Sequence, residues 1–130
     1  MNGAVVVTVL AALMAQGTAW AGEVIAHPSV NLSADEVRDV FLGEKQLAGD
    51  LRLIPVDNSA IQAEFLAKVL QTDAKKYAAR WTKKTFREGI TAPAVKGSDA
   101  EVTAYVRGTP GAIGYVGGPP PEGVKRLEKF

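Results

Sequence analysis

The 130-residue sequence contains no cysteine and a single histidine, His27. Without cysteine the chain has no disulfide framework, so its core and its hydrogen bonds must hold it together. A metal site would have to be built almost entirely from carboxylates, and a serine–histidine pair could use only His27. A lone histidine at the end of a predicted strand is typical of a surface or loop position. We therefore expect no enzymatic activity, no metal site and no cofactor.

The sequence also lacks an excess of charge of either sign. Its 15 lysines and arginines nearly balance its 14 aspartates and glutamates, which gives a formal net charge of +1. Proteins that bind nucleic acids or anionic membranes usually carry a clear positive excess. The composition therefore gives no reason to expect either of them as a partner.

The first 21 residues contain no charged residue. An apolar run from Ala4 to Met14 is followed by small residues and ends in Ala19-Trp20-Ala21, which is the pattern of a secretory signal with an A-x-A-like cleavage site. The run is shorter than the roughly 20 apolar residues that span a bilayer. The basic residues that usually open a signal are missing. We expect residues 1–21 to be a signal peptide, residues 22–130 to form one domain, and the location to be periplasmic.

Apolar periodicity and turn residues predict alternating strands and helices over the rest of the chain. Strands are expected at residues 23–27, 52–56, 94–96 and 112–116, and a tail or short strand at 124–130. Helices are expected at 33–43, from 59 onward, from 72 or 73 to 89, and at 98–108. Three of these helices are predicted to begin with a capping box, formed by Ser33 with Glu36, Ser59 with Gln62, and Ser98 with Glu101. The pattern predicts an α/β fold, a single three-layer lobe with a small, mostly parallel or mixed sheet flanked by helices.

Asp57, Asn58 and Ser59 lie where the second predicted strand passes into a helix, and Ala60 follows them. In a parallel sheet this is the carboxyl edge, where ligands usually bind. The unpaired amides of a first helical turn favour an anion there, and the side chains of Asn58 and Ser59 add donors. In the alternative interpretation Ser59 only caps its helix. An ionised Asp57 would repel an anion but would accept a hydrogen bond from a protonated one, such as hydrogen phosphate.

Six basic residues recur, mainly at steps of three and four, along the third predicted helix. The cations are Lys75, Lys76, Arg80, Lys83, Lys84 and Arg87, and they lie beside or opposite the aromatic residues Tyr77, Trp81 and Phe86. We expect the three aromatic side chains to be core residues. The basic residues form either a solvated face or a surface for an acidic partner.

The glycine-rich stretch from Arg107 to Gly118, RGTPGAIGYVGG, does not have the spacing of a phosphate loop. A Walker A loop requires Gly-Lys-Ser/Thr, which is absent, and a G-x-G-x-x-G loop lies between a strand and a helix. Here the glycines end a helix, form a Pro-Gly turn and continue into a strand of small residues. The stretch therefore predicts an inner strand, and not an anion site.

Three segments of the chain resemble the phosphate-binding periplasmic proteins of ABC transporters. SDAEVTAYVRGTPGAIGYV (98–116) is similar to the closing helix, turn and strand of the family's second lobe. LSADEVRDVFLGEK (32–45) is similar to a family helix with an acidic start. VDNSAIQAEF (56–65) is similar to the family's Ser-Gly-Thr-x-x-x-Phe element, with Ser59 and Phe65 in register. The order and the spacing of the three segments also match.

This resemblance implies a type II periplasmic binding protein fold in a short, single-lobe form. It implies a ligand site for phosphate or a similar oxyanion, with candidate residues Asp57, Asn58, Ser59 and Ala60, and with Gly108 and Thr109 as rim contacts. The family's role is solute binding for a membrane transporter, and not catalysis.

The chain departs from the family in two ways. The arginine that precedes the family's serine by four positions is Pro55 here, and the glycine and threonine that follow the serine are Ala60 and Ile61, so the residue that would bind an oxyanion bidentately is missing. The chain also has the length of one lobe, whereas the family's proteins close two lobes on phosphate. We therefore expect an exported protein that binds phosphate or another oxyanion weakly. The alternative is a periplasmic interaction or sensor module that docks on a membrane transporter or sensor subunit.

Overall fold

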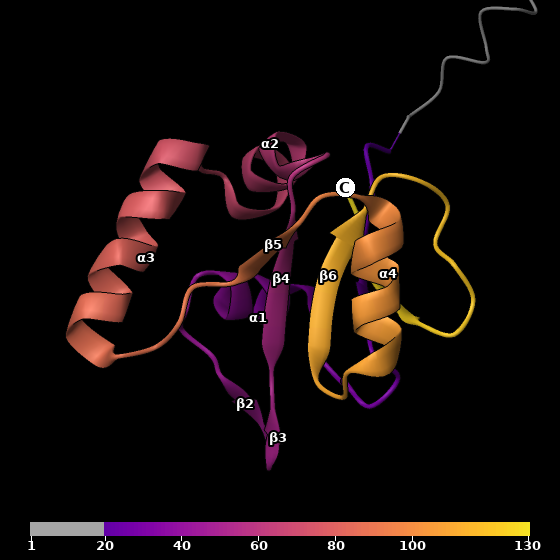
Figure 1. Ribbon diagram of the computed structural model, residues 1–130, viewed down its shortest axis with the longest axis horizontal. Helices are drawn as coiled ribbons and strands as arrows, with labels where there is room; N and C mark the ends of the chain where they lie inside the picture. Colours follow the sequence, from indigo (N-terminus) through magenta and orange to yellow (C-terminus); the bar gives the residue numbers. More distant parts are fainter. Residues whose placement is uncertain (1–19) are drawn as a thin grey trace, which may run out of the picture.

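The computed structural model describes residues 20–130 (Figure 1). Almost all of the predicted signal peptide, residues 1–21, therefore lies outside the described residues. The elements are β1 (Glu23–Ala26), α1 (Ala34–Phe41), β2 (Leu47–Ala48), β3 (Leu51–Arg52), β4 (Ile54–Asn58), α2 (Gln62–Phe65), the π-helical turn η2 (Leu66–Leu70), α3 (Ala74–Glu88), β5 (Ala94–Lys96), α4 (Asp99–Gly108), β6 (Ala112–Val116) and β7 (Lys125–Lys129). Within residues 20–130, no helix has the length and apolarity needed to cross a bilayer.

Five strands form one mixed sheet in the order β5-β4-β6-β1-β7, and β2 and β3 form a separate hairpin. Strand β4 runs parallel to β5 and β6, whereas β1 runs antiparallel to β6 and β7. The parallel pairing brings the carboxyl ends of β4, β5 and β6 to one edge of the sheet. The predicted α/β lobe is confirmed, with a mixed rather than a mostly parallel sheet. The hairpin spans residues 47–52, where no strand was predicted before Arg52.

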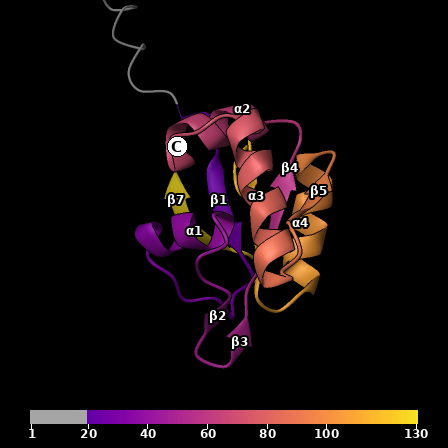
Figure 2. The ribbon, with the colours of Figure 1, turned by 90° about the vertical axis from the view of Figure 1, so that its left-hand side faces the viewer.

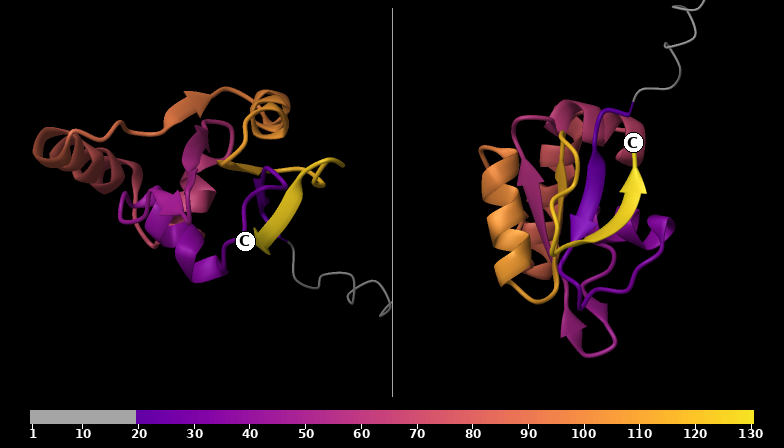
Figure 3. Two further views of the ribbon diagram at one scale, coloured as in Figure 1. Left: turned by 90° about the horizontal axis from the view of Figure 1, so that it is seen from below. Right: turned by 90° about the vertical axis from the view of Figure 1, so that its right-hand side faces the viewer.

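Helices cover both faces of the sheet and produce the three predicted layers. On one face, the helices α1, α2 and η2 pack on a core that includes Phe41, Phe65 and Tyr115. On the other face, α4 packs on a smaller core that includes Val56, Val102 and Ala112. Figure 3 (left) shows α4 and α1 on opposite sides of the strands. Burial of both cores is the main source of stability in a domain without disulfides.

Strand β6 is buried along its whole length, because it lies inside the sheet between the two helical layers. A Cβ atom at Gly114 would lie 2.6 Å from Cγ1 of Val102 in α4. The missing side chain therefore lets α4 approach the sheet closely. The stretch RGTPGAIGYVGG therefore contains the end of α4, a turn and the inner strand β6, and its small residues predict that strand.

Two of the predicted helix caps form and one does not. Ser33 and Glu36 make both hydrogen bonds of a capping box, and the Ser98 side chain accepts from the amide of Glu101 at 3.2 Å. The predicted box of Ser59 with Gln62 is wrong, because α2 begins at Gln62 and has no side-chain cap. The amide of Ser59 instead donates to the carbonyl of Lys96 and extends the pairing of β4 with β5.

Helix α3 stands at one side of the molecule, and Figure 2 looks onto that side. Its buried residues are Tyr77 and Trp81, whereas the side chain of Phe86 is 90% exposed. The prediction that Phe86 belongs to the core is therefore wrong. Phe86 lies five positions after Trp81, which at 3.6 residues per turn places it about 140° away around the helix.

Candidate functional site

Four of the six predicted site residues lie at the carboxyl edge of the sheet. Asp57 and Asn58 are the last residues of β4, and Ser59 and Ala60 form the turn that follows. Because β6 runs parallel to β4, the residues that follow β6, Gly117 and Gly118, end at the same edge. This is the edge at which ligands bind in open α/β sheets.

Asn58 is fully buried and uses every polar atom of its side chain. Its Nδ2 donates to Oδ1 of Asp99 at 2.8 Å and to the carbonyl oxygen of Tyr115 at 3.0 Å. Its Oδ1 accepts from the amide of Ala60 at 3.0 Å. Asn58 therefore connects the ends of β4, β6 and α4, because Asp99 is the first residue of α4.

The carboxylate of Asp99 is the centre of the site. The amide of Gly117 donates to both of its oxygens at 3.1 Å, and the amide of Gly118 donates to Oδ2 at 3.1 Å. With Nδ2 of Asn58, three donor groups from two neighbouring strand ends converge on one carboxylate. The chain thus holds an oxyanion of its own at the edge where a ligand would bind.

The amides that the sequence analysis assigned to an anion have partners within the chain. The amide of Ser59 donates to the carbonyl of Lys96 at 2.9 Å, that of Ala60 to Oδ1 of Asn58, and that of Ile61 to the carbonyl of Asn58 at 3.2 Å. The short helix α2 begins only after them. The donors that face an oxyanion at this edge are therefore those of Asn58, Gly117 and Gly118.

Asp57 points into the protein interior and is only 2% exposed. Its carboxylate accepts from the hydroxyl of Tyr115 at 2.7 Å and from the hydroxyl of Tyr77 at 2.9 Å. Burial raises the pKa of Asp57, and the two tyrosine hydroxyls partly oppose this shift. Burial and the neighbouring carboxylate also raise the pKa of both tyrosines. The hydrogen bond from Tyr77 to Asp57 connects helix α3 to the sheet.

The raised pKa of Asp57 predicts a particular dependence of stability on pH. Between the pKa of an unfolded aspartate, about 3.9, and the raised native value, the folded state binds more protons than the unfolded state. The free energy of unfolding contributed by Asp57 therefore falls as the pH rises through this range. We expect the stability advantage of the wild type over Asp57→Asn to shrink as the pH rises from about 4 to about 7.

Urea unfolding of both proteins across this pH range measures the trend. The variant Asp50→Asn, which removes an exposed carboxylate from a turn, controls for a change in surface charge. An advantage of the wild type over Asp57→Asn that grows with pH would contradict the burial argument.

The structure does not bring every predicted site residue together. Gly108 ends α4 and Thr109 caps it, so both lie at the end of that helix opposite to Asp99. Asp99, Gly117 and Gly118 were not among the residues predicted from the sequence. Two features of the sequence could have indicated these residues: two glycines follow a predicted strand directly, and an aspartate follows a capping serine directly.

Within residues 20–130, no group of three or more histidine, aspartate and glutamate side chains is placed to hold a metal ion.

Comparison of the sequence with models of protein families and with curated proteins gave no match. Among solved structures, the fold is similar to that of an ABC-type phosphate transport receptor from Vibrio cholerae, with a TM-score of 0.52 and 14% sequence identity. The similarity covers 84% of this chain and 46% of the receptor, so the chain spans about half of the receptor's length. At this identity the likeness concerns the fold alone. The chain therefore has the fold of one lobe of a periplasmic binding protein.

Proposed function

We propose that the protein is an exported, periplasmic solute-binding protein of single-lobe form that binds phosphate or another small oxyanion weakly. The site lies at the carboxyl edge of the sheet, where β4 ends in Asp57 and Asn58 and where Ser59 and Ala60 form the turn that follows. One observation carries the proposal: Asn58, Gly117 and Gly118 aim donors at a single carboxylate there. N–H donors that bind the oxygens of a carboxylate can also bind the oxygens of phosphate.

In this proposal the side chain of Asp99 competes with the ligand. An external oxyanion takes up the same three donors only when the Asp99 carboxylate turns away from them. Because Asp99 is part of the chain, its effective concentration at the donors is high. The exposed hydroxyl of Ser59 adds a donor at the rim of the turn. Weak binding follows from this competition and from the absence of an arginine and a second lobe.

The first test is isothermal titration with phosphate, sulfate and acetate. The variant Asp99→Ala leaves the three donors free, and we expect its affinity for phosphate to exceed that of the wild type by about 10- to 100-fold. This is the factor by which a binding-competent state populated at about 1–10% lowers an apparent affinity. The matched control is Glu101→Ala, which removes an exposed carboxylate from the same turn of α4 and leaves the donors to Asp99 unchanged.

The outcomes separate binding at this site from the general effect of removing a negative charge. Equal gains in affinity for the two variants would assign the effect to overall charge and contradict the proposed site. The absence of heat with any of the three anions, for the wild type and for Asp99→Ala at millimolar concentrations, would contradict oxyanion binding. A reduced affinity of Ser59→Ala would add the rim hydroxyl to the site.

The alternative, an interaction or sensor module on the same scaffold, is favoured by a different part of the molecule. Most residues of α3 are exposed, and the helix carries six basic residues and one glutamate. A helix that buries only two side chains has most of its surface available for a partner. A membrane transporter or sensor subunit is the partner that this alternative implies.

A further inference from the structure

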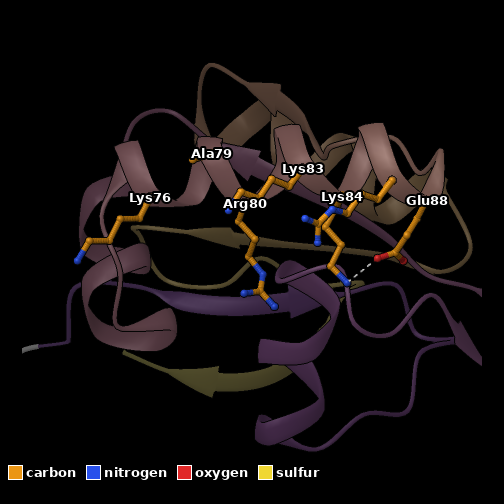
Figure 4. Close-up of a pocket in the computed structure, with 7 residues that line it drawn as sticks. Lys76, Ala79, Arg80, Lys83, Lys84 and Glu88 are labelled. Carbon is orange, nitrogen blue, oxygen red and sulfur yellow. Dashed lines mark ion pairs between the residues drawn. The ribbon is translucent and has the colours of Figure 1, made fainter.

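We propose that helix α3 is the docking element for an acidic segment of a partner protein. The surface consists of Lys76, Arg80, Lys83, Lys84 and Arg87, which we call the basic face. Figure 4 shows the labelled side chains of Lys76, Arg80, Lys83 and Lys84 on α3, with Lys84 close to Glu88. They line a shallow depression of about 370 Å³. The inference names a surface and a partner chemistry for the interaction module, and it does not depend on oxyanion binding at the sheet edge.

Two of the five basic residues have a structural role. Arg80 pairs with Glu44 at 2.6 Å, and its Nε donates to the carbonyl of Leu42 at 2.9 Å. Lys84 lies 3.2 Å from both Glu44 and Glu88, and its side chain is only 15% exposed. These contacts hold α3 against the end of α1, so reversing either charge would disturb the fold as well as the surface.

The other three basic residues are available for a partner. Lys76, Lys83 and Arg87 are exposed, and none of them forms an ion pair with any residue between 20 and 130. Their spacing of seven and four residues places them on one side of the helix. Three unpaired cations in a row on a rigid helix favour a partner with several carboxylates.

The positive charge is concentrated on this helix. Six of the protein's 15 basic residues, but only one of its 14 acidic residues, lie in α3, although the whole chain carries a net charge of only +1. The remainder of the protein is therefore negatively charged on balance. An acidic partner is attracted to α3 and repelled by the rest of the surface, which orients it on approach.

An apolar groove on another side of α3 indicates a protein segment, and not a membrane surface or a nucleic acid. The groove lies between α3 and β5 and has a volume of about 740 Å³. Phe86 and Val95, which are 90% and 59% exposed, line it. Phe86 follows Lys83 by three residues, so the two side chains are neighbours on the helix surface. A segment with carboxylates and an apolar side chain can cover both, whereas a flat lipid surface cannot enter the groove.

The test uses fluorescence anisotropy with two labelled synthetic peptides, one of glutamates interrupted by leucines and one of glutamates alone. The variant Lys76→Glu/Lys83→Glu/Arg87→Glu is compared with the control Arg52→Glu/Lys68→Glu/Lys129→Glu, which makes the same change in net charge at exposed positions away from α3. We expect the α3 variant to lose about 10-fold or more in affinity for both peptides and the control to lose far less. We expect Phe86→Ser to weaken only the leucine-containing peptide.

Several results would overturn the proposal. One is an equal loss of affinity in the α3 variant and the control. Another is binding to vesicles of phosphatidylglycerol and phosphatidylethanolamine that depends on α3 while neither peptide binds. A third is analytical ultracentrifugation showing that α3 mediates self-association of the wild type.

All variants should melt at nearly the wild-type temperature, since the changed side chains are exposed. The donors to Asp99 are unchanged in them, so phosphate titration of the same variants tests oxyanion binding separately.

Discussion

Replacing Asn58 by aspartate is expected to lower the free energy of unfolding by about 3 kcal/mol or more, which is the cost of a buried charge without a partner. The substitution places an oxygen where Nδ2 now donates to Asp99 and to the carbonyl of Tyr115. Two carboxylates would then face one another at a fully buried position, and the carbonyl would lose its donor. Urea unfolding monitored by circular dichroism measures the loss.

A charge swap provides the control for this prediction. In the double variant Asn58→Asp/Asp99→Asn, the amide of residue 99 can donate to the new carboxylate, so part of the lost stability should return. The coupling free energy in a double-mutant cycle measures the contact between the two side chains. If the two substitutions prove additive, the account of Asn58 as the donor that holds Asp99 is contradicted.

Replacing Gly111 by alanine is expected to cost about 3 kcal/mol or more, since strain and overpacking each typically cost about 1–3 kcal/mol. Gly111 has φ of +86°, a conformation that favours glycine. A Cβ atom there would also collide with the carbonyl oxygen of Arg52, which is main chain and cannot rotate away. The collision would disturb the start of β6, because the carbonyl of Gly111 accepts from the amide of Ile54. Thermal unfolding measures this loss of stability.

Gly49→Ala is the matched control for Gly111→Ala. Gly49 also has a positive φ, of +64°, but a Cβ atom there would meet nothing within 4 Å. We expect a cost of only about 1 kcal/mol, from backbone strain alone. Equal losses for the two substitutions would show that the contact with Arg52 has no energetic role.

Much of the fold could be predicted because local signals agreed with the tertiary structure. The strand at 112–116 and the helices after Ser33, Asp73 and Ser98 form where apolar spacing and capping residues predict them. The short pairs of β2 and β3 could not be predicted in the same way, because two-residue strands carry no periodic pattern. Spacing alone also placed Phe86 in the core, although its angle around α3 leaves its side chain exposed.

The site was only partly predictable, for a physical reason. The position of Asp57 and Asn58 at the end of a strand locates the carboxyl edge of the parallel strands, where the candidate site lies. Which groups donate to Asp99 depends on which strand lies beside β4 and on where α4 begins. No local sequence pattern indicates either of these. Ser59 has the sequence of a cap, but its amide pairs with Lys96 in a strand that lies 37 positions later in the chain. A long-range pairing thus overrides a local preference.

The location of Asp99 suggests how a single lobe can remain stable without a ligand. Without Asp99, the buried Asn58 would keep its bond to the carbonyl of Tyr115 but would lose one acceptor, and an unsatisfied buried donor costs about 1–3 kcal/mol. The carboxylate of Asp99 satisfies this donor from within the chain, and it lies at the start of α4, where a negative charge is favourable. In the proposed function, the same contact that stabilises the fold competes with an external oxyanion.

The most direct test of the account is NMR spectroscopy of the wild type and Asp99→Ala during titration with phosphate. We expect saturable shifts of the backbone amide signals of Gly117 and Gly118 and of the side-chain amide signal of Asn58, with saturation at a lower phosphate concentration in Asp99→Ala. The amide signals of Gly108 and Thr109, at the other end of α4, should move little. Unchanged signals of Gly117, Gly118 and Asn58 in both proteins would contradict the proposal that this edge of the sheet binds oxyanions.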